Sequence, residues 1–178
     1  MNIRKLTTIA LMSAVICILA PISIPIPISP VALTLCTFAL YLTSYVLDVK
    51  DAVAATGLYL LIGSIGIPVF SGYMSGVSRF AAPGGGYLVG YLFLVGISSY
   101  FIHRYPEKPV VHILGMFFAT MVTYTIGTLW MSHVMGAGFL ATLPMGALIF
   151  IPLDLVKIGF ACYVGRKVNT YLVRATIA

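Results

Sequence analysis

The sequence predicts an all-α integral membrane protein, a compact bundle of six transmembrane helices with both termini in the cytoplasm. Its composition is the first reason: 61% of the 178 residues are hydrophobic and only 8% are charged, whereas a soluble domain has about 25% charged residues. The second is a set of long uncharged stretches, and the third is the placement of the basic residues. The length leaves room for one domain over residues 1–178 and for no separate catalytic module.

Four runs contain no Asp, Glu, Lys or Arg: Leu6–Leu47, Ala52–Ser78, Phe80–His103 and Pro109–Leu153. A helix needs about 20 apolar residues to cross a bilayer, so the first and last runs are long enough to cross twice. Proline and glycine divide these two runs, which predicts helices near residues 4–20, 31–48, 51–68, 84–104, 109–134 and 144–172.

The boundaries follow from local signals. The first helix resembles a signal peptide, but it lacks a small-residue cleavage pattern and Pro21 follows it, so we expect it to be retained. Four prolines in "PISIPIPISP" forbid continuous helix before the second. A Gly- and Pro-rich stretch, residues 66–86, separates the third helix from the fourth. The polar "HRYPEKP" precedes the fifth, and "MGAGFLATLP" interrupts the chain before the sixth.

The basic residues set the predicted orientation. With six crossings, eight of the ten fall on one side of the membrane: Arg4, Lys5, Lys50, Arg104, Lys108, Arg166, Lys167 and Arg174. Lys and Arg collect in cytoplasmic loops, so this side is predicted to be cytoplasmic. Five or seven crossings would scatter these charges over both faces.

Three charged residues, Asp154, Lys157 and Arg79, remain in the outer half of the protein. Asp154 and Lys157 are three residues apart and share one face of the sixth helix. A charge within a span costs about 2.5–3.5 kcal/mol on insertion scales. The pair is therefore either an internal salt bridge that fixes helix packing or part of a polar ligand site.

Arg79 lies in the glycine-rich loop before the fourth helix, near "PGGGY". Gly85, Gly86 and Tyr87 there are predicted to offer close backbone approach and helix N-terminal N–H groups to an anion or a carbonyl oxygen. The alternative is a flexible loop with one solvated arginine. A carboxylate, two cations and aromatic residues suit a small amphipathic molecule with an acidic group.

Tyr41 and Trp130, with Tyr87, are candidates to cover the apolar body of such a ligand. Each is otherwise a core residue or a residue of the membrane-interface belt. On the first helix, Ala10 and Ala14 form a small-xxx-small motif. This motif serves internal packing or the docking of a separate membrane subunit.

Several kinds of chemistry have no motif in this sequence. It contains no HExxH, no nucleophile elbow and no G-x-x-x-x-G-K-[ST] phosphate loop. Its three cysteines lie in apolar runs without metal or redox spacing. We therefore expect no enzyme activity, no catalytic residue, no metal, no cofactor and no nucleic-acid partner. The lipid bilayer is expected to surround the protein.

The chain resembles the biotin-specific substrate-binding (S) components of energy-coupling-factor (ECF) transporters, the BioY family, over essentially its whole length. The matching stretches are "PISIPIPISPVALTL", "YLLIGSIGIPVFSG", "PGGGYLVGY" and "FIPLDLVK". The chain departs from the family at Cys36, Gly84 and Leu153, where members commonly have Gln, Thr and Gly. No role is carried over to those three positions.

The resemblance implies a multi-pass protein of a prokaryotic plasma membrane whose single domain binds biotin from the outer side with high affinity. It also implies a transmembrane coupling subunit, which contacts the Ala10 and Ala14 face, and two cytoplasmic ATPases. Biotin also fits the chemistry of these residues: Asp154 is expected to accept from the ureido N–H groups, and Lys157 to donate to the ring or hold Asp154. Arg79 and the loop amides are expected to meet the carboxylate, although the sequence leaves open which cation faces which end of the ligand. Two alternatives stay open: a proton-coupled secondary transporter for an acidic amphipathic solute using Asp154, and a membrane enzyme with Asp154 as general acid or base.

Overall fold

The computed structural model describes residues 3–177, and the side chains as far as residue 169. The predicted helical architecture is confirmed. The long helices are α1 (Ile3–Leu19), α2 (Cys36–Val46), α3 (Val49–Ser64), α5 (Gly85–Arg104), α6 (Pro109–Met135) and α8 (Ile151–Ile177). The short elements are β1 (Ser23–Ile24), β2 (Leu33–Thr34), the 3₁₀ turn η1 (Ser71–Tyr73), α4 (Ser78–Ala81), α7 (Phe139–Leu143) and the π-helical turn η2 (Pro144–Leu148).

Three helical stretches of the described residues are long and apolar enough to cross a bilayer: Gly85–Arg104, Pro109–Met135 and Phe139–Asn169. Cys36–Val46 is a shorter apolar helix. A membrane protein of the all-α class is therefore confirmed. The number of six crossings and the cytoplasmic location of both termini stay predictions.

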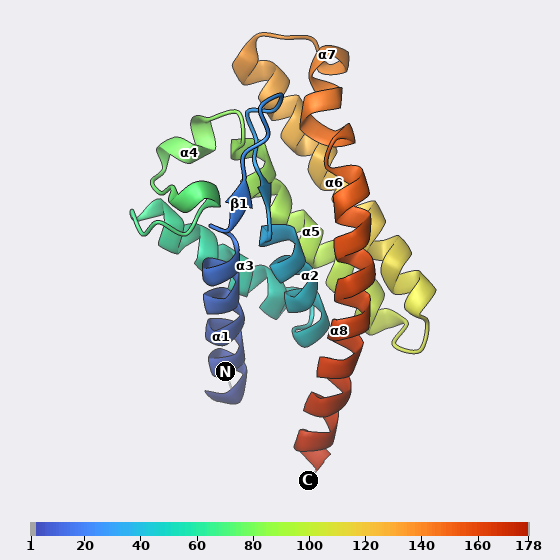
Figure 1. Cartoon of the computed structure of the whole chain (residues 1–178). Coiled ribbons are helices and arrows are strands. Elements are labelled where there is room, and N and C mark those ends of the chain that lie inside the picture. Colours follow the sequence, from blue (N-terminus) through green and yellow to red (C-terminus); the bar gives the residue numbers. More distant parts are fainter. Residues whose placement is uncertain (1–2, 178) are drawn as a thin grey trace.

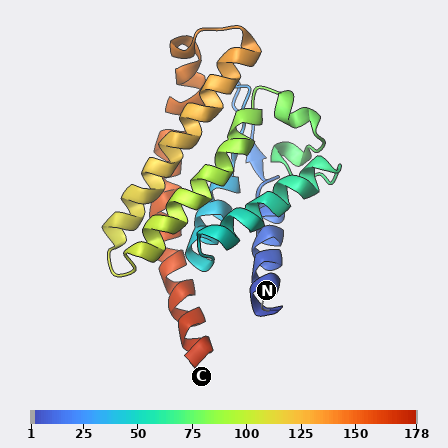
Figure 2. The ribbon, with the colours of Figure 1, turned by 180° about the vertical axis from the view of Figure 1, so that it is seen from behind.

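The short helix α2 lies at the centre of the molecule and packs against α8, α5, α1 and α3 (Figure 1). Helices α5 and α6 run antiparallel beside each other, and α3 crosses α5 on the face seen in Figure 2. Three side chains of α2, Leu40, Tyr41 and Tyr45, are fully buried in the core. This centre is where α2 meets α8, which carries the Asp154–Lys157 pair.

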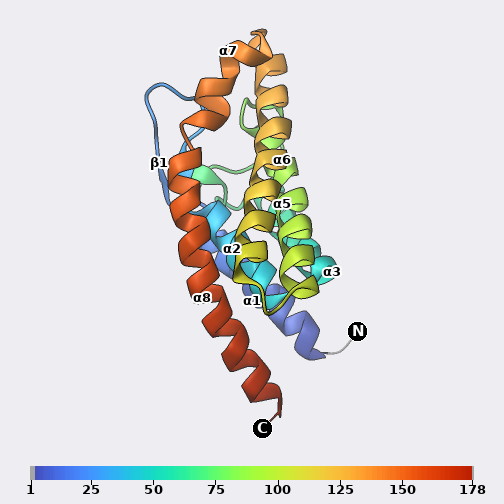
Figure 3. The ribbon, with the colours of Figure 1, turned by 90° about the vertical axis from the view of Figure 1, so that its right-hand side faces the viewer.

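The two ends of the molecule differ. Both chain termini point toward one end, whereas the β1–β2 hairpin, α4 and α7 lie toward the other (Figures 1 and 3). At the end with the termini, Lys5 forms ion pairs with Asp51 at 3.0 Å and with Asp48 at 3.7 Å. These contacts connect the start of α1 to the junction of α2 and α3.

The second predicted helix begins later than expected. The predicted range 31–48 includes residues 31–35, but Leu33 and Thr34 form strand β2, which pairs antiparallel with Ser23 and Ile24. The proline-rich segment thus returns on itself as a hairpin, and α2 starts only at Cys36. A proline-rich sequence signals the break in the helix, but not the pairing across it.

The third predicted helix is also shorter at one end, and the sixth begins with a π-helical turn. Helix α3 ends at Ser64 instead of residue 68, because Gly66 adopts a φ of 109° and the chain turns there. Residues 144–148 form the turn η2, and α8 follows from Ile151. Within η2 the Ile149 N–H bonds the Pro144 carbonyl five residues earlier, at 3.2 Å. Such π-helical turns are frequent at functional sites.

Candidate functional site

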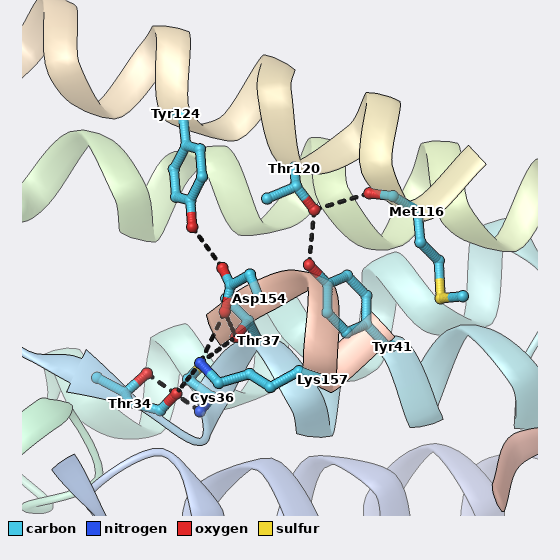
Figure 4. A network of polar contacts seen from close by, with 9 residues as sticks. All are labelled: Thr34, Cys36, Thr37, Tyr41, Met116, Thr120, Tyr124, Asp154 and Lys157. Carbon is cyan, nitrogen blue, oxygen red and sulfur yellow. Dashed lines mark hydrogen bonds and ion pairs between the residues drawn. The ribbon is translucent and has the colours of Figure 1, made fainter. Parts of the chain in front are cut away.

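Asp154 lies in the first turn of α8, and its side chain is only 5% exposed. Its Oδ1 accepts hydrogen bonds from Lys157 Nζ at 2.7 Å and Thr37 Oγ1 at 3.2 Å, while its Oδ2 accepts one from the Tyr124 hydroxyl (Figure 4). The partners come from α8, α2 and α6. The carboxylate is therefore held between three helices of the bundle.

Lys157 is fully engaged. Its Nζ donates to Asp154 Oδ1 at 2.7 Å, to the Thr34 carbonyl at 2.7 Å and to Thr37 Oγ1 at 3.1 Å. An ammonium group has three donors and all three are used, so Lys157 has none left for a ligand in this arrangement. Its contact with Thr34 connects α8 directly to strand β2 of the hairpin.

Asp154 retains unused capacity. A carboxylate offers about four acceptor positions, of which Oδ1 uses two and Oδ2 uses one. One position on Oδ2 is thus available to an N–H or O–H donor that enters from the cavity in front of it.

That cavity, the inner chamber, is small, with a volume of about 30 Å³. Small-molecule sites usually have about 300–1,000 Å³, so a ligand that enters here must push the lining side chains apart. Its walls combine the polar cluster with aromatic and aliphatic side chains: Val31, Ala32, Leu33, Thr34, Thr37, Tyr87, Tyr91, Leu94, Thr120, Thr123, Tyr124, Phe150, Asp154 and Lys157. An apolar body with N–H donors at one end suits such walls.

A second cavity, the outer chamber, adjoins the first and has a volume of about 290 Å³. Arg79 of α4 lines it, together with the hairpin and the loop that contains η1: Ser23, Pro25, Pro30, Val31, Ala32, Thr34, Phe70, Ser71, Gly72, Met74, Arg79, Gly84, Tyr87, Leu88 and Tyr91. Val31, Ala32, Thr34, Tyr87 and Tyr91 line both chambers. Arg79 and the Asp154–Lys157 pair therefore face two adjacent cavities.

Tyr87 is the predicted aromatic residue that does lie at these cavities. Its hydroxyl donates to the Gly146 carbonyl at 2.6 Å and lies 3.4 Å from Thr128 Oγ1. A Cβ atom at Gly127 would collide with its ring, so the glycine creates the space that the ring occupies. Tyr87 thus joins α5 to the turn η2 at the wall between the two chambers.

Gly85, Gly86 and Trp130 lie elsewhere. They line a third, apolar hollow between α5 and α6, with Phe80, Val89, Ile126, Leu129 and His133. The Trp130 indole N–H donates to the Ala82 carbonyl at 3.1 Å. The structure does not bring these three residues to the chambers that Asp154 and Arg79 line.

The backbone N–H groups at the start of α5 are partly used. Those of Gly85 and Tyr87 already donate to the carbonyls of Ala82 and Gly84, at 2.8 and 3.2 Å. The structure therefore does not present them as free donors to an anion.

Tyr41 lies behind the inner chamber. It is fully buried, and its hydroxyl is 2.6 Å from that of Thr120, which does line the chamber (Figure 4). Tyr41 thus supports the wall from the core of the molecule.

Ala10 and Ala14 are exposed on α1. Large apolar side chains of the same helix, Leu6, Leu11 and Ile18, are also exposed. This face of α1 is not covered by the described part of the chain.

Sequence reasoning missed the partners of the charged pair, namely Thr34, Thr37 and Tyr124. Their residue types gave no distinguishing signal, because most threonines in this fold bond their own helix: Thr43 Oγ1 and Thr56 Oγ1 donate to carbonyls four residues earlier at 2.9 Å. Only the packing of α2 and α6 around Asp154 singles out Thr37 and Tyr124.

Comparisons with known proteins agree with this arrangement. The model of the BioY family matches residues 1–174. The chain is 36% identical to the biotin transporter BioY2 of Lactococcus lactis subsp. cremoris, covering 88% of this chain and 85% of the relative. It is 32% identical to the biotin transporter BioY of Rhizobium etli, covering 94% of each.

A solved structure has the same fold. The crystal structure of the S-component for biotin from an ECF-type ABC transporter superposes with a TM-score of 0.88 at 26% sequence identity. The match covers 94% of this chain and 92% of that one. The fold described above is therefore that of a known membrane component.

Proposed function

The chain belongs to the BioY family, and we propose that it is the biotin-binding S component of an ECF-type importer. It lies in the plasma membrane as a multi-pass protein and captures biotin from the outer side. A transmembrane coupling subunit and two cytoplasmic ATPases, which are separate chains, complete the transporter. The chain itself forms one substrate-binding domain and performs no catalysis.

One observation supports this proposal above the others: a buried carboxylate with one free acceptor position lines a small cavity, and a larger cavity of about 290 Å³ adjoins it. Biotin carries two ureido N–H donors, an apolar thioether ring and tail, and a terminal carboxylate. An N–H group of the ureido ring occupies the free position on Asp154 Oδ2. The apolar ring packs among Leu33, Tyr91 and Phe150, which line the inner chamber.

Lys157 positions Asp154 and does not bind the ligand through a donor of its own. All three of its N–H groups are already bonded to Asp154, Thr34 and Thr37. The tail of biotin passes between Tyr87 and Tyr91 toward the outer chamber. There Arg79 attracts the carboxylate, because no acidic side chain contacts it within the described residues.

The coupling subunit docks on the small-residue face of α1 at Ala10 and Ala14. Small side chains let two helices approach closely in a membrane, and both alanines are exposed. ATP hydrolysis takes place on the separate ATPases, since this sequence has no phosphate-binding loop.

Two measurements test the proposal. The chain purified in detergent binds biotin at one to one without nucleotide in a calorimetric titration, and absence of heat from folded protein contradicts the assignment. In cells, uptake stops when ATP is depleted and survives loss of the proton gradient. The reverse dependence indicates the proton-coupled secondary transporter instead.

A further inference from the structure

We infer that the outer chamber is a second subsite that accepts an extension of biotin beyond its carboxyl carbon. This inference rests on the proposed function. It widens the substrate class to biotin joined through an amide to an amine or an amino acid, such as biotinyl-lysine. The inner chamber then selects the bicyclic ring, and the outer chamber tolerates what is attached to the tail.

The ring end is restrictive because its two charged groups already have fixed partners, which leaves one acceptor position on Asp154 Oδ2. Asp154 is 3% exposed and accepts from Lys157, Thr37 and Tyr124, and Lys157 has no free donor. A ligand without an N–H donor for Oδ2 would desolvate a buried charge without replacing its hydrogen bond, which is costly. Discrimination between ligands is therefore concentrated at this end.

The tail end has spare room and spare polar groups. The outer chamber has a volume of about 290 Å³, against about 30 Å³ for the inner one. Arg79, Ser23 and Ser71 line it, and within the described residues no hydrogen bond or ion pair of these three side chains is present. The carboxylate of biotin pairs with the Arg79 guanidinium alone. The hydroxyls of Ser23 and Ser71 remain for the amide of an extended ligand and for the polar end of an attached amino acid.

The charge on the tail contributes little to affinity. Arg79 is partly exposed to solvent, and ion pairs of exposed groups change an equilibrium by about fivefold at most. Conversion of the carboxylate to an amide removes this contribution. New hydrogen bonds from Ser23 and Ser71 offset part of the loss.

The test compares three ligands on the purified full chain: biotin, biotin methylamide and biotinyl-lysine. We expect both amides to bind within about tenfold of biotin in calorimetric titration, a difference of about 1.4 kcal/mol. A loss of more than about a hundredfold for both amides would overturn the inference. If biotin itself does not bind, the proposed function fails, and this outcome is distinguishable from the first.

Two variants assign the effect to the outer chamber. Arg79→Gln is expected to weaken biotin by about fivefold and to leave biotin methylamide unchanged. Ser71→Tyr fills the chamber from its loop, and we expect it to weaken biotinyl-lysine selectively. Thermal unfolding first checks that Ser71→Tyr is folded. If this folded variant loses affinity for biotin and for biotinyl-lysine equally, the chamber is not a separate subsite and the inference is wrong.

Discussion

The buried pair of Asp154 and Lys157 permits an experiment that separates a role in ligand binding from a role in stability. Asp154→Asn keeps the shape of the side chain, and its amide oxygen still accepts a hydrogen bond from Lys157. It loses the negative charge and replaces one acceptor by a donor. In the wild type, Asp154 Oδ2 accepts an N–H of biotin. In the variant, the Asn side chain presents either its own N–H group, which repels that N–H, or its neutral oxygen, which is a weaker acceptor.

The magnitude follows from the contacts. A hydrogen bond to a charged group contributes about 1.5–3 kcal/mol, so Asp154→Asn is expected to weaken biotin by about 10- to 150-fold. The single variant is also less stable, because the Lys157 side chain, 13% exposed, becomes a cation without a counterion. Breaking a buried pair in this way costs about 3–5 kcal/mol of stability. Because the amide oxygen of the variant still contacts Lys157, we expect the loss of stability near the lower end of this range.

The double variant Asp154→Asn/Lys157→Met removes the lone cation. Replacement of both charges of a buried pair is often neutral for stability, so we expect the melting temperature to recover. Biotin affinity is not expected to recover, because the acceptor for the ligand is still missing. Calorimetric titration and thermal unfolding of wild type, both single variants and the double variant provide the full comparison.

The result that refutes this reasoning is equally specific. If the double variant regains both stability and wild-type biotin affinity, the pair only fixes helix packing. If Asp154→Asn alone binds biotin normally, Oδ2 is not the acceptor for the ligand.

Two further predictions concern the parts of the molecule around the site. Tyr87→Phe removes the 2.6 Å hydrogen bond to the Gly146 carbonyl, which is expected to lower stability by about 1–3 kcal/mol in thermal unfolding. Tyr100→Phe on the same helix, where the side chain is 55% exposed, is the matched control, and an equal effect of both changes would contradict the role of the bond. Ala14→Trp is expected to spare biotin binding and to abolish co-purification with the coupling subunit. Val156→Trp on the exposed face of α8 is its control, and assembly that survives Ala14→Trp would show that the α1 face does not dock this partner.

The positions of the long helices could be predicted from the sequence because the signals are local. Uncharged stretches, prolines and glycines mark where a membrane helix can continue and where it must stop. The ends of α5 and α6 accordingly lie within one residue of the predicted ranges. The end of α3 and the start of α2 differ because a positive φ at Gly66 and a strand pairing across the prolines are not encoded in hydropathy.

The charged pair was also accessible from sequence. Residues three apart on a helix share a face, so the contact of Asp154 with Lys157 follows from spacing alone once α8 is recognised. Their isolation in an apolar chain made them candidates for function. The resemblance to the BioY family then supplied the ligand, which residue spacing does not contain.

Tertiary structure alone decided what surrounds the pair. Thr37 donates to Asp154 whereas Thr43, on the same helix, donates to its own backbone. Tyr124 reaches the carboxylate, while Trp130 on the same α6 lies at a separate hollow. A sequence pattern fixes the face of a helix on which a residue lies, but the neighbour that this face meets depends on how the helices pack, which is a property of the whole folded chain.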